Sequence, residues 1–200
     1  MQTLKEKHIV ILSAHPDDLE MSCGGTVAKF VEDGNKVTSI VMAGGVPHLE
    51  YLNRASGYLG IDPIIFSMSN SVKVDKNVIK ELEVMVDFST VDLIITHWNE
   101  DWHQDHQACH EIGNILARKQ PMDLWYMSAH PYNLKYKHFT PDLYIDIGSW
   151  SYKSKLNAVK AYDNIPNKWV RGVMHHDVWR GSYLDTKYAE VFAVGNQVIK

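Results

Sequence analysis

The sequence predicts an α/β protein with a Rossmann-like, doubly wound and mostly parallel sheet that is covered by helices on both faces. Three observations carry this prediction. Short apolar runs rich in β-branched residues recur along the chain, segments with helical periodicity lie between them, and polar clusters follow the first and the fourth apolar run. Because 200 residues are a usual length for one domain, we expect a single domain over residues 1–200.

The predicted elements alternate from the N-terminus onward. The apolar runs are too short for helices and are expected to be buried strands, whereas the segments between them repeat apolar residues every three or four positions. Gly34 and Gly60 are expected to end two helices, because glycine readily adopts the left-handed conformation that closes a helix. We expect strands at 9–12, 36–42, 63–66, 92–96, 124–127 and 143–147, and helices at 19–32, 49–59, 77–88, 105–118 and 152–162.

The first polar cluster is His15-Pro16-Asp17-Asp18, which directly follows the apolar run 9–12. A phosphate-binding loop at this point would be rich in glycine, whereas an imidazole and two carboxylates repel phosphate and attract a divalent cation. His15 and Asp18 lie three residues apart across a proline and can face one ion. Asp18 taken alone is equally well explained as the N-cap of the following helix, since aspartate is favoured there.

The second polar cluster follows the run 92–96 and extends from His97 to His106. Three histidines and two aspartates lie within these ten residues. If a helix begins near Gln104, His103 and His106 project from nearly the same side of it, and Asp105 can bond one imidazole. In doubly wound sheets ligands bind where the strand order reverses, commonly between the first and fourth strands. We therefore expect the two clusters to meet in one site.

On these residues the chain resembles the PIG-L (LmbE-like) zinc-dependent N-deacetylases, which remove acetyl groups from amino-sugar conjugates. Residues 14–18 match the family's A-H-P-D-D signature, and residues 96–106 are similar to its T-H-x-x-x-D-Y-H-P-D-H segment, with Trp102 and Gln104 in place of Tyr and Pro. Later family landmarks follow in order at 141–147, at Lys155 with Ala158, and at 188–192. The resemblance therefore spans nearly the whole chain.

The resemblance implies a metal site formed by His15, Asp18 and His106, with one Zn²⁺ per chain and Fe²⁺ as an alternative. Two histidines and one carboxylate leave positions open for water and substrate, as a catalytic zinc requires. The resemblance also implies that Asp17 is the general base and that a protonated His103, held by Asp105, stabilises the oxyanion. The expected reaction is hydrolysis of the N-acetyl group of an N-acetylhexosamine-type sugar or its conjugate.

Two segments depart from the family pattern. The family usually has a longer loop with an Arg and a Glu near the substrate, whereas this chain has the short stretch 44–50, so that neither Glu50 nor Arg54 can be assigned to that role. The family's H-x-S-Q is replaced by Tyr162-Asp163-Asn164-Ile165. Both segments belong to substrate-contacting regions, and the particular sugar therefore stays open.

Other residues allow a functional interpretation beside a structural one. Four aromatic side chains just past strand ends could form a wall for a sugar ring, although aromatic packing within loops is the commoner explanation. His175-His176-Asp177 could hold a second metal, but a surface loop is favoured. Cys23 and Cys109 favour buried packing over metal binding. The four aromatic residues are Trp98, Trp102, His130 and Tyr132.

Composition and charge narrow the choice of partners. A net charge of −4 gives no electrostatic argument for nucleic acid, and no apolar stretch reaches the length of a membrane span. We expect a cytoplasmic protein that acts on a small-molecule amino sugar, with no nucleic acid and no membrane insertion. A homo-oligomer is left open.

Two other classes of protein share these features. Two histidines and one carboxylate also serve the non-haem Fe(II) oxygenases, and a non-catalytic sugar- or metal-binding protein needs only the ligands. Asp17 and the His103–Asp105 pair favour hydrolysis over both alternatives, because neither alternative requires a general base beside the metal.

Overall fold

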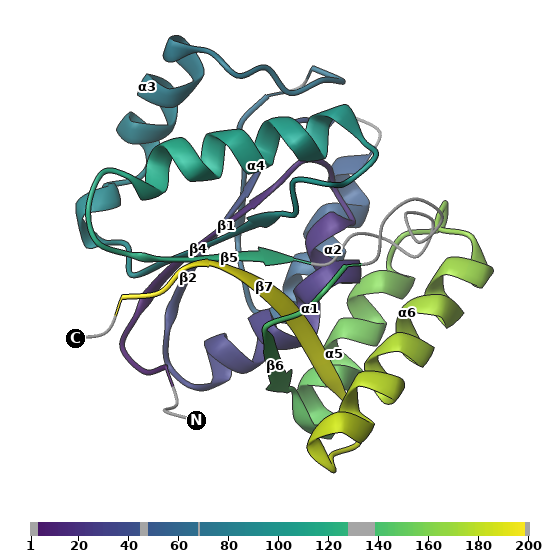
Figure 1. Ribbon diagram of the computed structural model, residues 1–200. Coiled ribbons are helices and arrows are strands. Elements are labelled where there is room, and N and C mark those ends of the chain that lie inside the picture. The colour runs from purple at the N-terminus through teal and green to yellow at the C-terminus, as the bar shows by residue number, and fades with distance from the viewer. Residues whose placement is uncertain (1–3, 45–47, 68, 128–138, 199–200) are drawn as a thin grey trace.

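A seven-stranded sheet with the order β3-β2-β1-β4-β5-β7-β6 forms the centre of the molecule (Figure 1). The computed structural model describes residues 4–44, 48–67, 69–127 and 139–198. Strands β1 to β5 are parallel, and β7 runs antiparallel to its neighbours β5 and β6. This arrangement confirms the predicted doubly wound, mostly parallel sheet.

The element bounds agree closely with the expected ones over most of the chain. The strands are β1 His8–Ser13, β2 Lys36–Val41, β3 Pro63–Ile65, β4 Leu93–His97, β5 Asp123–Met127, β6 Leu143–Asp146 and β7 Ala189–Asn196. The helices are α1 Asp18–Glu32, α2 Leu49–Leu59, α3 Lys76–Met85, α4 Gln104–Ala117, α5 Gly148–Lys160 and α6 Asn167–Gly181, with 3₁₀ turns η2 Phe88–Thr90 and η4 Ser182–Leu184.

The sheet separates two hydrophobic cores. Successive side chains of a strand point to opposite faces, so that Ile9 and Ile11 of β1 pack into one core while Val10 and Leu12 pack into the other. Helices α3 and α4 cover one face, and α1, α2, α5 and α6 cover the other (Figure 1). Burial on both faces explains why β1 is apolar at consecutive positions and does not alternate with polar ones.

The strand order reverses at β1. Ile9 of β1 lies beside Val37 of β2 on one side and beside Leu93 of β4 on the other. The chain thus proceeds outward from β1 to β3 and returns at β4, which places the carboxyl ends of β1 and β4 next to each other. The expected position of the switch point is confirmed, and both polar clusters lie at it.

The C-terminal part contains two elements that the sequence did not predict. Residues 175–177 lie inside α6, so the expected surface loop there is wrong. Helix α6 buries Asp177 while leaving Val178 and Trp179 exposed, and β7 buries Glu190. Charged residues inside and apolar residues outside obscure the periodicity that otherwise reveals a helix or a strand. Within the described residues no helix has the length and apolar character needed to span a membrane.

Candidate functional site

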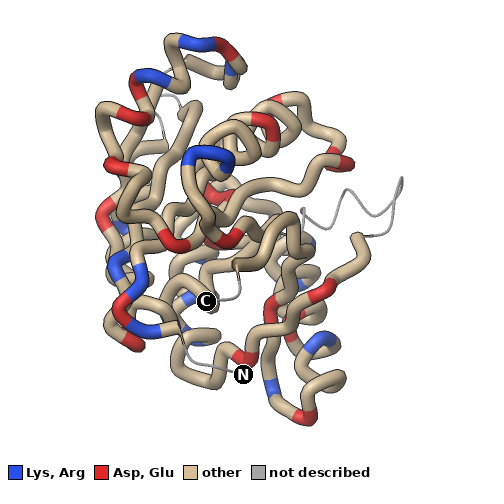
Figure 2. Tube along the Cα trace, turned by 60° about the vertical axis from the view of Figure 1, so that its left-hand side comes forward, with Lys and Arg blue, Asp and Glu red and all other residues tan. Residues whose placement is uncertain are grey.

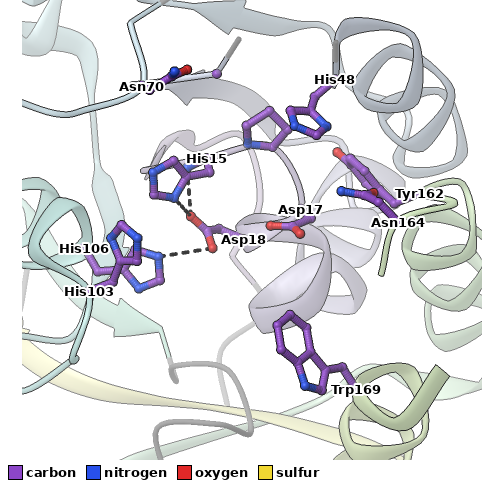
Figure 3. A pocket seen from close by; sticks show the side chains of 12 residues that line it. His15, Asp17, Asp18, His48, Asn70, His103, His106, Tyr162, Asn164 and Trp169 are labelled. Atoms are coloured by element: carbon purple, nitrogen blue, oxygen red, sulfur yellow. Dashed lines mark hydrogen bonds and ion pairs between the residues drawn. The ribbon is translucent and has the colours of Figure 1, made fainter. Parts of the chain in front are cut away.

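The Asp18 carboxylate lies at the centre of the site, between two imidazoles (Figure 3). Its Oδ1 is 3.3 Å from Nε2 of His106, and its Oδ2 is 3.5 Å from Nδ1 of His15. Ligands placed tetrahedrally about 2.0–2.1 Å from one zinc ion are separated from each other by about 3.3–3.4 Å. The distance from Asp18 to each histidine is therefore the one expected between two ligands of a single divalent metal ion. Within the described residues, two overlapping groups have donor atoms close enough to share an ion: His15 with His103 and His106, and Asp18 with His97 and His106.

A buried aspartate orients each of the two imidazoles. Asp105 Oδ2 is 2.9 Å from Nε2 of His15, and Asp101 Oδ2 is 2.8 Å from Nδ1 of His106. In each ring one nitrogen is held by a carboxylate and the other is turned toward Asp18. Carboxylate partners of this kind select the tautomer of a metal-ligating histidine and strengthen it as a ligand. Asp101 was recognised in the sequence as a member of the polar cluster, but its role in orienting His106 was not predicted.

The charges around His15 and His106 favour positive charge in the centre of the site. Burial acts to lower the pKa of His106, but the Asp18 carboxylate and the Asp101 hydrogen bond outweigh it and raise the pKa to about 10. The pKa of His15 is raised too, because Asp18 and Asp105 outweigh its burial. Because a histidine must be neutral at the nitrogen that binds a metal, a divalent metal must displace these protons to bind.

His97, the last residue of β4, is a structural neighbour of the ligands. Its Nε2 accepts a 3.0 Å hydrogen bond from the Ala14 backbone N–H, and its ring stacks on His106 with centroids 3.9 Å apart. Burial lowers the pKa of His97 to about 4, so the ring is neutral. This side chain joins the ends of β1 and β4 and supports the His106 ring. Its Nε2 is also 3.5 Å from Asp18 Oδ2, but the lone pair of this nitrogen accepts the Ala14 N–H.

Asp17 lies beside Asp18 and lines the pocket (Figure 3). Its backbone adopts φ +93° and ψ −27°, a left-handed conformation that is unfavourable for a residue with a side chain. Such strain is typical of functional sites, where the surrounding structure imposes it. The position predicted for the general base is therefore one at which the backbone is held in a costly conformation.

His103 differs from the expectation in its protonation and in its partner. Its Nδ1 accepts a 3.2 Å hydrogen bond from the Asp105 backbone N–H, which leaves Nε2 as the protonated nitrogen of a neutral ring. Burial and the charge of His106 lower the pKa of His103. The Asp105 carboxylate lies 3.8 Å from His103, because it bonds His15 and the Val72 backbone N–H instead. The lowered pKa disfavours the protonated His103 that the resemblance implies, and the shorter contacts of Asp105 are with His15 and Val72.

A cavity of about 350 Å³ opens over these residues. Tyr162 borders it and donates a 3.1 Å hydrogen bond to the buried Glu20, whose pKa burial raises to about 8. In Figure 3 the Trp169 indole lies across the pocket from His48 and Asn70. The lining residues are His15, Pro16, Asp17, Asp18, Gly44, His48, Asn70, His103, His106, Tyr162, Asn164 and Trp169.

Of the aromatic residues predicted to contact substrate, Trp98 and Trp102 are not among these lining residues. Trp98 packs edge-on against Phe139, with ring centroids 5.3 Å apart, and Trp102 is exposed. His130 and Tyr132 lie outside the described residues. Trp169, which sequence reasoning missed, supplies the indole instead. It comes from the first turn of α6, a helix that was not predicted.

The remaining candidate residues make contacts that support the fold and do not belong to the pocket. Arg54 donates a 2.8 Å hydrogen bond to the Ala161 carbonyl and does not line the pocket. Cys23 and Cys109 are fully buried, and burial raises the pKa of both thiols. In the described part of the chain, the groups able to hold a metal all belong to the site around Asp18, and none includes His175 or His176. Basic and acidic residues are interspersed along the chain (Figure 2).

The fold and these side chains define an α/β domain with a His/Asp centre suited to a divalent metal at its switch point. A family model described as PIG-L, GlcNAc-PI de-N-acetylase, matches residues 10–116. The chain therefore belongs to the PIG-L family of deacetylases, as its motifs led us to expect.

Individual relatives are similar over most of their length. The uncharacterized deacetylase YaiS of Escherichia coli (strain K12) is 23% identical over 175 residues, covering 79% of this chain and 91% of that protein. The N,N'-diacetylchitobiose deacetylase of Pyrococcus horikoshii has a TM-score of 0.76 at 16% identity, covering 94% of this chain and 83% of that one. The 4-carboxy-2-hydroxymuconate hydratase GalB of Pseudomonas putida KT2440 has a TM-score of 0.82 at 15% identity, covering 97% and 98%. Since a hydratase shares the fold, the reaction must be argued from the site.

Proposed function

We propose that this protein is a zinc-dependent N-deacetylase that removes the acetyl group from an N-acetylhexosamine-type sugar or its conjugate. The observation that carries the proposal is the convergence of His15, Asp18 and His106, with an orienting carboxylate behind each imidazole and Asp17 beside them. These three residues would hold the metal, for which Fe²⁺ is the alternative to Zn²⁺. When bound, a divalent metal polarises an amide carbonyl and makes water a stronger acid.

The chain's own residues supply the proton transfers. Asp17, at the pocket wall, accepts a proton from the attacking water and delivers it to the departing amine, because an amide nitrogen leaves poorly as an anion. His103 is neutral with its proton on Nε2, and it donates a hydrogen bond to the oxyanion of the tetrahedral intermediate. Water and the acetamide are consumed, and acetate and the free amine are released.

The pocket suits one sugar ring. Its volume of about 350 Å³ lies at the lower end of the range for small-molecule sites. We assign the apolar wall to Trp169, on which a ring can stack, and the polar contacts to Asn164 and His48, which can bond hydroxyl groups. These assignments replace Trp98 and Trp102 as the proposed substrate contacts.

The test is acetate release, measured by mass spectrometry, from a panel of free and conjugated N-acetylhexosamines. Wild type is expected to release acetate and free amine in equal amounts, and Asp17→Asn is expected to keep its metal and lose several orders of magnitude in rate. Equal rates in both proteins would place the base elsewhere. Binding of the sugars without turnover would indicate a binding protein, and oxygen consumption in place of acetate release would indicate an Fe(II) oxygenase.

A further inference from the structure

Helix α1 is not continuous. Cys23 has φ −143° and ψ 19°, values outside the helical region, and it divides α1 into a short first segment and a longer second one. The first segment begins with Asp18 and follows Asp17 directly. The direction of this short segment therefore decides where both carboxylates lie relative to His106 on α4.

The second segment is capped by a side chain from the other end of the protein. In an uninterrupted helix the N–H groups of Gly25 and Thr26 would point to the carbonyls four residues earlier. Both instead donate to the Glu190 carboxylate of β7, at 2.9 Å to Oε1 and 2.6 Å to Oε2. A carboxylate at this point satisfies the N–H groups and complements the positive end of the helix dipole.

The backbone of α1 approaches this carboxylate closely at a glycine. A Cβ atom on Gly25 would lie 3.2 Å from Glu190 Oε1 and 2.5 Å from Ile147 Cδ1. A side chain at Gly25 would therefore displace Ile147 and crowd the Glu190 carboxylate.

Glu190 is held in turn by a buried ion cluster. Lys155 Nζ of α5 lies 2.7 Å from Glu190 Oε1 and 2.7 Å from Asp177 Oδ2 of α6, and all three side chains are at most 2% exposed. Desolvation makes buried ion pairs expensive, and apolar replacements are frequently neutral or stabilising. Stability alone is therefore a weak reason for three charges in the core beside the broken helix.

We propose that Glu190, held by Lys155, is a positioning residue that sets the break in α1 and thereby places Asp17 and Asp18 for metal binding and proton transfer. This inference rests on the metal centre proposed above. Without the cap, the freed N–H groups of Gly25 and Thr26 can close helical bonds and straighten α1. Any reorientation of its first segment changes the 3.3 Å distance between Asp18 Oδ1 and His106 Nε2, and metal–ligand distances in protein sites lie within about 0.2 Å of their usual values.

The test uses Co²⁺ alone as a probe of the metal centre. Glu190→Gln keeps the size of the side chain, but its amide can accept from only one of the two N–H groups. Asp177→Asn is the matched control, because it alters the same ion cluster and leaves the cap in place. The visible absorption spectrum of the Co²⁺-loaded protein and the Co²⁺ dissociation constant are measured for wild type and both variants, together with their free energies of unfolding.

We expect Glu190→Gln to change the Co²⁺ spectrum and to bind Co²⁺ about 10–100-fold more weakly, as other changes behind a metal ligand do. Asp177→Asn should keep the wild-type spectrum and affinity. The proposal is overturned if Glu190→Gln loses stability while its Co²⁺ spectrum and affinity stay as in wild type. It is also overturned if Asp177→Asn perturbs both as strongly, because general disturbance of the core would then suffice.

A second variant and the wild-type control distinguish failure of the positioning role from failure of the metal centre. If Glu190→Gln does not fold, the comparison is made with Glu190→Asp, which keeps the charge and withdraws the carboxylate from Gly25 and Thr26 by one methylene. A wild-type protein that binds no Co²⁺ would refute the metal centre itself, whereas binding that is indifferent to both Glu190 variants would refute only the positioning role.

Discussion

Metal binding to this protein should be coupled to the release of protons from the ligand histidines. The charges of Asp18 and Asp101 outweigh burial and raise the pKa of His106 to about 10. At neutral pH the ring therefore carries a proton that a metal must displace. Since the proton competes directly, the affinity should fall about tenfold for each unit of decreasing pH, or about 100-fold between about pH 8 and about pH 6. His15, whose pKa is also raised, should steepen this dependence toward pH 6.

The coupling can be measured in two ways. Competition with a chelator gives the zinc dissociation constant at each pH, and calorimetry in buffers of different ionisation enthalpy gives the number of protons released. Asp101→Asn is the informative variant, because it removes the carboxylate bonded to Nδ1 of His106. It should bind zinc about 10–100-fold more weakly near pH 8 and show a shallower dependence on pH. Zinc binding that releases no proton at neutral pH would refute this account of the His106 charge.

Three other predictions concern catalysis, substrate and stability. His103→Ala should lower kcat about 10²–10³-fold, the usual loss for one oxyanion donor. The alkaline limb of the pH–rate profile should remain, because the lowered pKa of His103 keeps its ring neutral in that range. Disappearance of that limb in the variant would contradict a neutral His103. Trp169→Ala should raise KM with little change in kcat. Trp98→Ala, which alters a side chain outside the pocket, should change neither quantity. A raised KM in Trp98→Ala alone would reverse the assignment of the substrate contact. Burial raises the pKa of Asp177 to about 6, so its contribution to stability is present below about pH 4 and is lost as the pH rises through about 6. Between about pH 4 and about pH 7, Asp177→Asn should therefore lose less stability than wild type in urea unfolding, and equal pH dependence in the two proteins would disprove the shift.

Much of the fold could be predicted because its signals are local. The apolar runs of β1 and β4 and the periodic segments between them are properties of neighbouring residues, and parallel sheets of this kind have few allowed topologies. Helix α3 ends earlier than expected because Val86 is already extended. Helix α6 and strand β7 were not predicted, because they bury Asp177 and Glu190 against Lys155 of α5. No local sequence pattern indicates such a contact.

The sequence by itself determined that the polar clusters around Asp18 and His106 would lie together, because each follows a strand that flanks the switch point. Only the tertiary structure decided which carboxylate forms a hydrogen bond with which imidazole. Asp105 bonds His15, 90 positions away in the chain, at 2.9 Å, whereas its neighbour His103 is 3.8 Å away. The tertiary structure alone also decided that Trp169 borders the pocket and that Glu190 caps α1 across 165 positions. The physical reason is that hydrogen bonds and burial depend on distances of a few ångströms between remote segments, whereas periodicity and motif spacing report only on residues close along the chain.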